Sequence, residues 1–144
     1  MTLEEKQVPS DIVVEPRLRE AIEARLDAKG KLSCAHAFRI AEALSLPPLT
    51  VGQAADALQI HLTRCQIGLF GYPQGKGWKG TAIPEQPIPE GLEAAIRAEL
   101  DEQGHIGCAQ IWAIAARMHL PKMVVGYWVD KLGYKITPCQ LGAF

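Results

Sequence analysis

The string TPCQLGAF at residues 137–144 is almost the same as an earlier string of the chain, TRCQIGLF at residues 63–70. The displacement is 74 residues, and at this offset residues 18–70 align with residues 92–144 without a gap. Of the 53 aligned pairs, 22 are identical, so the chain is internally duplicated. Because solenoid repeats span only roughly 20 to 50 residues, we expect each copy to be a small domain that its own terminal string closes.

The length and composition are those of a folded globular protein. The chain has 144 residues, of which 48% are hydrophobic and 22% charged, and these proportions are typical of soluble domains. Two copies of roughly 55 residues are each near the lower limit for an independent core, so we expect them to pack together. The N-terminus lacks the apolar core of a signal peptide, and no apolar run is long enough for a membrane span. These features predict a cytoplasmic protein without disulfides.

The charge is segregated along the chain although the net charge is only −1. Residues 1–28 carry a net charge of −3 and residues 29–79 carry +4. Residues 80–103 then carry −5, and residues 104–144 carry +3. Each copy therefore begins acidic and ends basic, which favours a basic surface for an anionic partner. Ordinary solvated charge is the alternative interpretation.

Apolar residues recur at helical spacing three times in each copy. In the first copy they predict helices at residues 18–26, 34–44 and 51–58, with Ser33 as the N-cap of the second. Alternation at residues 60–63 predicts a short strand. The apolar spacing and the alternation recur 74 residues later, with Gly107 in the place of Ser33. The sequence thus predicts three helices and a short strand in each copy.

We therefore predict a mainly α fold of two tandem repeats with short β-strands. An N-terminal arm is expected at residues 1–16 and the first repeat at residues 17–72. A Gly/Pro-rich basic loop and linker follows at residues 73–90, before the second repeat at residues 91–144.

This order of elements resembles the winged helix-turn-helix modules of bacterial and archaeal transcription regulators, present twice in tandem. In the first copy the resemblance rests on the second-helix stripe, on the turn LSLPPLTVG at residues 44–52 and on the strand. It implies that the third helix lies in the major groove and that the loop after it, the wing, touches phosphate or the minor groove. It thus implies a non-enzymatic DNA-binding protein, a transcriptional regulator or an accessory to one.

The residues that this resemblance places at nucleic acid are outward positions of the third helices and basic or aromatic residues near them. They are Thr50, Gln53, Arg64, Lys76, Trp78, Lys79, Lys122, Tyr127, Lys131 and Lys135. Among the outward positions of the third helices, only Gln53 and Lys131 have side chains that make strong contacts to bases. We therefore expect most contacts to be made to phosphates.

Aromatic residues leave two interpretations open. The loop GYPQGKGWKG at residues 71–80 is interpreted as a wing, and a flexible connector with Trp78 against a core is the alternative. Tyr127 and Trp128 favour a protein partner, and a protein-interaction adaptor is the alternative function. The expected partners are thus duplex DNA, a protein that contacts this pair or a second copy of the chain, with no membrane.

Four cysteines recur at matching positions of the two copies: Cys34, Cys65, Cys108 and Cys139. Their spacings of 31, 43 and 31 residues differ from the close pairs of zinc and iron–sulfur sites. We interpret them as buried structural thiols, and a metal or redox-sensing site at these four residues is the alternative. No hydrolase, metalloprotease, phosphate-loop or dinucleotide motif is present, so the sequence predicts neither an enzyme nor a cofactor.

Overall fold

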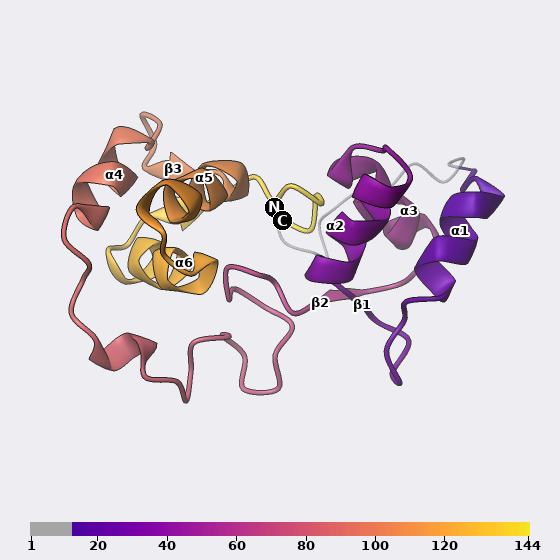
Figure 1. The fold of residues 1–144 in the computed structure, drawn as a ribbon, viewed down its shortest axis with the longest axis horizontal. Helices are drawn as coiled ribbons and strands as arrows, with labels where there is room; N and C mark the ends of the chain where they lie inside the picture. The colour runs from indigo at the N-terminus through magenta and orange to yellow at the C-terminus, as the bar shows by residue number, and fades with distance from the viewer. Residues whose placement is uncertain (1–12) are drawn as a thin grey trace. The chain divides into compact units, whose positions relative to one another are not determined.

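The computed structural model describes residues 13–144, which form a mainly helical protein with short strands (Figure 1). Most of the predicted N-terminal arm, residues 1–12, lies outside the described residues, and residues 13–15 form neither helix nor strand. The described chain divides into two compact units. Unit 1 contains the residues up to Cys65 together with residues 140–144, and unit 2 contains residues 66–139.

Unit 1 is built from three helices and two short strands. Ser33 caps the second helix as predicted, because its hydroxyl oxygen accepts a hydrogen bond from the N–H of His36 at 3.1 Å. The third helix begins at Pro48, where the missing N–H of proline leaves no helical hydrogen bond unmade. The elements are α1 (Pro16–Glu23), β1 (Leu32–Ser33), α2 (Cys34–Ala43), α3 (Pro48–Ala57) and β2 (Leu62–Thr63).

Unit 2 repeats this order after a single turn of 3-10 helix, η1. That turn at residues 83–85 interrupts the segment predicted as an extended linker, and it packs against the third helix of the unit. The elements are η1 (Ile83–Glu85), α4 (Leu92–Ala98), β3 (His105–Ile106), α5 (Cys108–Met118), α6 (Lys122–Lys131) and β4 (Lys135–Ile136). Across residues 13–144, none of the helices combines the length and the apolar character needed to cross a membrane.

The strands of each unit pair in parallel. Leu32 of β1 is opposite Leu62 of β2, and His105 of β3 is opposite Lys135 of β4. In the described part of the chain no antiparallel strand follows β2 or β4, and the loop at residues 71–80 holds an isolated bridge instead of a hairpin. The strand pairs therefore tie the end of each third helix to the start of each second helix.

The repeated strings cross between the copies, which differs from the expectation that each closes its own copy. Ile67 of the first string belongs to unit 2, where its carbonyl oxygen lies so close to Gly126 of α6 that a Cβ there would overlap it. Leu141 of the second string belongs to unit 1 and lies in the same way on Gly52 of α3. Gly52 and Gly126 are counterparts in the alignment, so the exchange is reciprocal.

The same reciprocity holds one residue further along each string. A Cβ at Gly68 would lie 3.0 Å from the side chain of Met123, and a Cβ at Gly142 would lie 2.8 Å from that of Leu49. Both glycines have positive φ angles, +89° and +75°, which other residues rarely adopt. Each string is therefore held by one face of a third helix, through close approach at glycine.

Two exposed turns carry matching carboxylates whose pKa values are lowered. Asp27 accepts a hydrogen bond from the N–H of Lys31 at 2.9 Å, and its counterpart Asp101 accepts one from the N–H of His105 at 2.8 Å. These backbone hydrogen bonds are the main reason that the pKa of each aspartate lies below its ordinary value. Both turns therefore favour the ionised carboxylate.

Acid is expected to weaken these turns. Because the folded pKa is lowered, the stabilisation is present above the unfolded value of about 3.9 and is lost as the pH falls through the folded value. The melting temperature should thus drop as the pH decreases below about 4, and Asp27→Asn with Asp101→Asn should make this decrease shallower. Thermal unfolding, followed by circular dichroism in steps of about half a pH unit between pH 2 and pH 7, measures this decrease in melting temperature. Glu20→Gln on α1 is the control, and an equal flattening by that variant would contradict the assignment.

Candidate functional site

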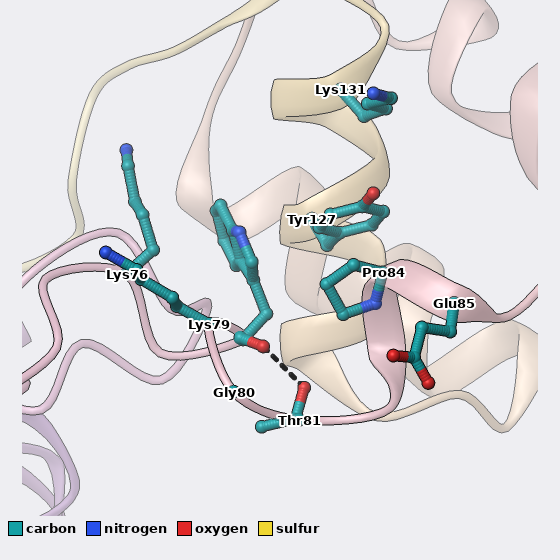
Figure 2. A pocket seen from close by; sticks show the side chains of 9 residues that line it. Lys76, Lys79, Gly80, Thr81, Pro84, Glu85, Tyr127 and Lys131 are labelled. Atoms are coloured by element: carbon teal, nitrogen blue, oxygen red, sulfur yellow. Dashed lines mark hydrogen bonds between the residues drawn. The ribbon is translucent and has the colours of Figure 1, made fainter.

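A lysine-rimmed pocket of about 540 Å³ lies in unit 2, between α6 and the loop that precedes η1 (Figure 2). The loop and η1 provide one wall, and one face of α6 provides the other. Its lining residues are Lys76, Trp78, Lys79, Gly80, Thr81, Pro84, Glu85, Tyr127 and Lys131. The pocket thus joins a glycine-rich loop, which has turns such as the hydrogen bond from the N–H of Thr81 to the carbonyl oxygen of Trp78, to a regular helix.

Two aromatic side chains form the floor of the pocket. Trp78 is 6% exposed and Tyr127 is 8% exposed. Their ring centroids are 5.5 Å apart at an interplanar angle of 80°, an edge-to-face contact. Tyr127 makes a second such contact with Trp128, at 5.2 Å and 83°. Tyr127, expected on an outward face of its helix, is therefore buried within unit 2, and Trp78 packs against a core as in the alternative interpretation of its loop.

The loop is held on unit 2 by the first repeated string. The N–H of Gly77 donates a hydrogen bond to the carbonyl oxygen of Gly68 at 2.7 Å. A Cβ at Gly77 would approach the side chains of Met123 and Tyr72 to 2.8 and 2.9 Å, so a larger residue does not fit there without movement. Thr81 closes the turn after Trp78, because its hydroxyl donates to the Trp78 carbonyl oxygen at 2.6 Å (Figure 2). The string at residues 66–70 therefore helps to position the indole.

Three ammonium groups stand around this floor. Lys76, Lys79 and Lys131 are all exposed, and Lys76 Nζ lies 5.6 Å from the centroid of the Trp78 ring. Lys131 follows Tyr127 by four residues on α6, so it lies on the same side of the helix (Figure 2). Among the lining residues Glu85 is acidic, which leaves a formal charge of +2 at the rim. This arrangement favours an anionic ligand.

The structure brings together five of the ten residues predicted at nucleic acid. Lys76, Trp78, Lys79, Tyr127 and Lys131 line the pocket. Thr50 and Gln53 line a different hollow, in unit 1.

The remaining three predicted residues lie apart from the pocket. Arg64 is exposed in unit 1, just after β2, and Lys135 is exposed on β4. Lys122 is engaged within unit 2: its Nζ lies 3.8 Å from the centroid of the Trp112 ring and donates a hydrogen bond to Gln66 at 3.1 Å. Lys122 thus holds the first string against unit 2.

Sequence reasoning missed the wall of the pocket formed by Thr81, Pro84 and Glu85. The prolines of residues 81–90 indicate an extended segment, and an extended segment carries no sequence signal for what it contacts. The short η1 turn against α6 returns this segment to the helix. A tertiary contact therefore determines this part of the site.

The recurring cysteines lie at the carboxyl ends of the paired strands. Cys34 and Cys65 follow β1 and β2, and Cys108 and Cys139 follow β3 and β4. Cys34, Cys65 and Cys108 are buried, as predicted for structural thiols, and Cys139 is partly exposed. From residue 13 onward, no three side chains of His, Cys, Asp or Glu are grouped so that they could hold a metal ion.

In comparisons with known proteins, no family model, curated protein or solved structure matches the chain. The chemistry of the site therefore rests on its own residues. A rim of ammonium groups above a buried aromatic floor can bind an anion, by charge and by hydrogen bonds from lysine.

Proposed function

We propose that this chain is a non-enzymatic DNA-binding protein whose unit 2 contacts the phosphate backbone of a duplex through Lys76, Lys79 and Lys131. The observation that supports the proposal is that these three exposed lysines, from two separate segments, line one pocket. Lysine binds phosphate as a point charge and needs no exact geometry. Such contacts provide affinity and orientation without reading sequence.

The proposed architecture is a tandem helix-turn-helix, of the winged type in the order of its elements. In each unit the second and third helices are joined by a short turn that ends in a proline, Pro47 or Pro121. The chain's own strings lie on α3 and α6 at Gly52 and Gly126, and Trp78 lies on Tyr127. We therefore propose backbone binding by a regulator, or an accessory to one, with little direct reading of bases by these helix faces.

A titration of labelled random-sequence duplex, followed by fluorescence anisotropy at low salt, tests this function. We expect a dissociation constant on the order of 10⁻⁴ to 10⁻⁶ M that increases steeply with salt. The triple variant Lys76→Gln, Lys79→Gln, Lys131→Gln should bind at least roughly tenfold more weakly. Its slope of log affinity against log salt should fall by roughly 0.9 for each phosphate that the variant no longer neutralises.

The control is a triple variant with the same change of charge at exposed basic residues outside the pocket, Lys29→Gln, Lys31→Gln and Arg117→Gln. This variant should keep most of the affinity and most of the salt slope. An equal loss in the two triple variants would assign binding to overall charge and overturn the role of the pocket. No binding at tens of micromolar protein would overturn DNA binding itself.

The alternative function, a protein-interaction adaptor that uses Tyr127 and Trp128, has less support. The Tyr127 ring is used inside unit 2, between Trp78 and Trp128. Its 8% exposure leaves little of the ring for a partner.

A further inference from the structure

Unit 1 contains a hollow of about 260 Å³. Because the sequence is duplicated, its lining residues can be compared with the aligned residues of unit 2. The hollow lies between α1, the turn before α3 and one face of α3. Its lining residues are Val13, Val14, Glu15, Leu18, Leu46, Thr50, Gln53 and Ala54. All of them belong to unit 1, so the hollow is complete within that unit.

At two of the lining positions, the matching residues of unit 2 carry larger side chains. The counterpart of Ala54 is Trp128, and the counterpart of Gln53 is Tyr127. The surrounding frame is the same in the two units, because α1 packs on α3 as α4 packs on α6. Trp128 is half-buried on α6, whereas Ala54 places only a methyl group at the matching site. Unit 1 therefore has a methyl group at the position where unit 2 has an indole.

The lining of the hollow indicates which kind of ligand it could bind. The half-buried side chains of Val14 and Leu46 supply apolar surface above Leu18 and Ala54, which are each 4% exposed, and such a lining suits a planar hydrocarbon ring. At the edge, Glu15 precedes α1 without capping it, so its carboxylate is not used by the helix. A carboxylate accepts hydrogen bonds and repels anions.

The amide oxygen of Gln53 and the hydroxyl of Thr50 add further acceptors to the lining. Apolar cavities of about 150 Å³ bind benzene, so the present volume is sufficient for a bicyclic ring. The lining thus combines room for a ring with acceptors for an N–H group.

We propose that unit 1 binds a small planar aromatic molecule with an N–H donor, neutral or cationic and about the size of indole, at Ala54. The ring lies next to Ala54, the position at which the matching residue of unit 2 is Trp128, and its N–H donates to the acceptors of the lining. This proposal is independent of DNA binding, because it concerns the other unit and a ligand without negative charge.

Titration of the full chain with indole, followed by ¹H–¹⁵N correlation NMR, tests the site. We expect a dissociation constant on the order of 10⁻³ to 10⁻⁴ M, as is usual for so small a ligand. The shifts in the unmodified chain should concentrate at Leu18, Leu46, Thr50 and Gln53. Benzofuran, which has the same shape but no N–H, should bind several-fold more weakly.

Three variants test the site, and two of them exchange the residues at the aligned positions 54 and 128. Ala54→Trp should fill the hollow and weaken indole binding at least tenfold. Ala57→Trp, on the same helix but outside the lining, should leave binding unchanged. Trp128→Ala should open a matching hollow in unit 2, so that two indole molecules bind instead of one.

Several results would overturn the proposal. In the unmodified chain, these are NMR shifts spread over both units, or no NMR shift up to the solubility of indole. In a folded Ala54→Trp chain, the contrary result is that the affinity for indole is retained. A single binding event in a folded Trp128→Ala chain would also remove the argument from the duplicate. The shift map of the unmodified chain needs no variant, so the proposal stays testable if a variant does not fold.

Discussion

Gly126→Ala is expected to destabilise unit 2 by about 3 to 5 kcal/mol, although alanine is the better helix former by about 1 kcal/mol. Gly126 lies in α6, and a Cβ there would overlap the carbonyl oxygen of Ile67. A backbone atom cannot move aside as a flexible side chain can, so the string must leave the helix. Ile67 is fully buried, and loss of its packing costs as much as truncation of a large core residue.

Urea unfolding, read as the change in free energy of unfolding, measures this effect. Gly52→Ala in α3 should behave in the same way, because its Cβ would overlap the carbonyl oxygen of Leu141. Ala113→Gly on the exposed side of α5 calibrates helix propensity and should cost about 1 kcal/mol. If Gly126→Ala is neutral or stabilising, the string does not lie on the helix as described.

Leu141→Ala is expected to destabilise unit 1, although the sequence assigns Leu141 to the second copy. Leu141 is 2% exposed and belongs to unit 1 together with α3. Removal of a buried leucine side chain costs about 2 to 5 kcal/mol. The amides of α2 and α3 should therefore lose protection, while those of α5 and α6 keep more of theirs.

Native-state hydrogen exchange resolves this difference, because it reports opening residue by residue. Ile67→Ala is the matched control and should give the opposite pattern, with the loss of protection in α5 and α6. A loss confined to unit 2 in the Leu141→Ala chain would contradict the exchange of the strings. Equal losses in both units would show that the units unfold as one cooperative body, and the urea transition would then be single.

Local chemistry made the helices predictable. The apolar stripes and Ser33 as an N-cap act within a few residues of themselves, and the structure confirms these elements. The predicted start of the third helix at residue 51 is wrong by one turn, because α3 begins directly at Pro48. The pocket was predictable only in part. Lys76, Lys79 and Lys131 stand out as basic residues, but the sequence did not indicate that η1 would return Glu85 to α6.

The glycines of the third helices illustrate the limit most clearly. Within a helical stripe, Gly52 and Gly126 look like weak points, since glycine lowers helix propensity. In the structure both positions require glycine, because the main chain of the other copy approaches each helix so closely that a Cβ would overlap it. This approach joins residues that are about 60 to 90 positions apart, beyond any local propensity.

By itself, the sequence determined the duplication, the helices of each copy and the basic character of the loop that follows the first string. Tertiary structure alone decided which copy each string completes, since TRCQIGLF and TPCQLGAF have nearly the same apolar pattern and could suit either third helix. It also decided that Trp78 and Tyr127 form a floor while Ala54 leaves a hollow. Burial depends on neighbours that are distant in the sequence, whereas helix formation depends on neighbours within one or two turns.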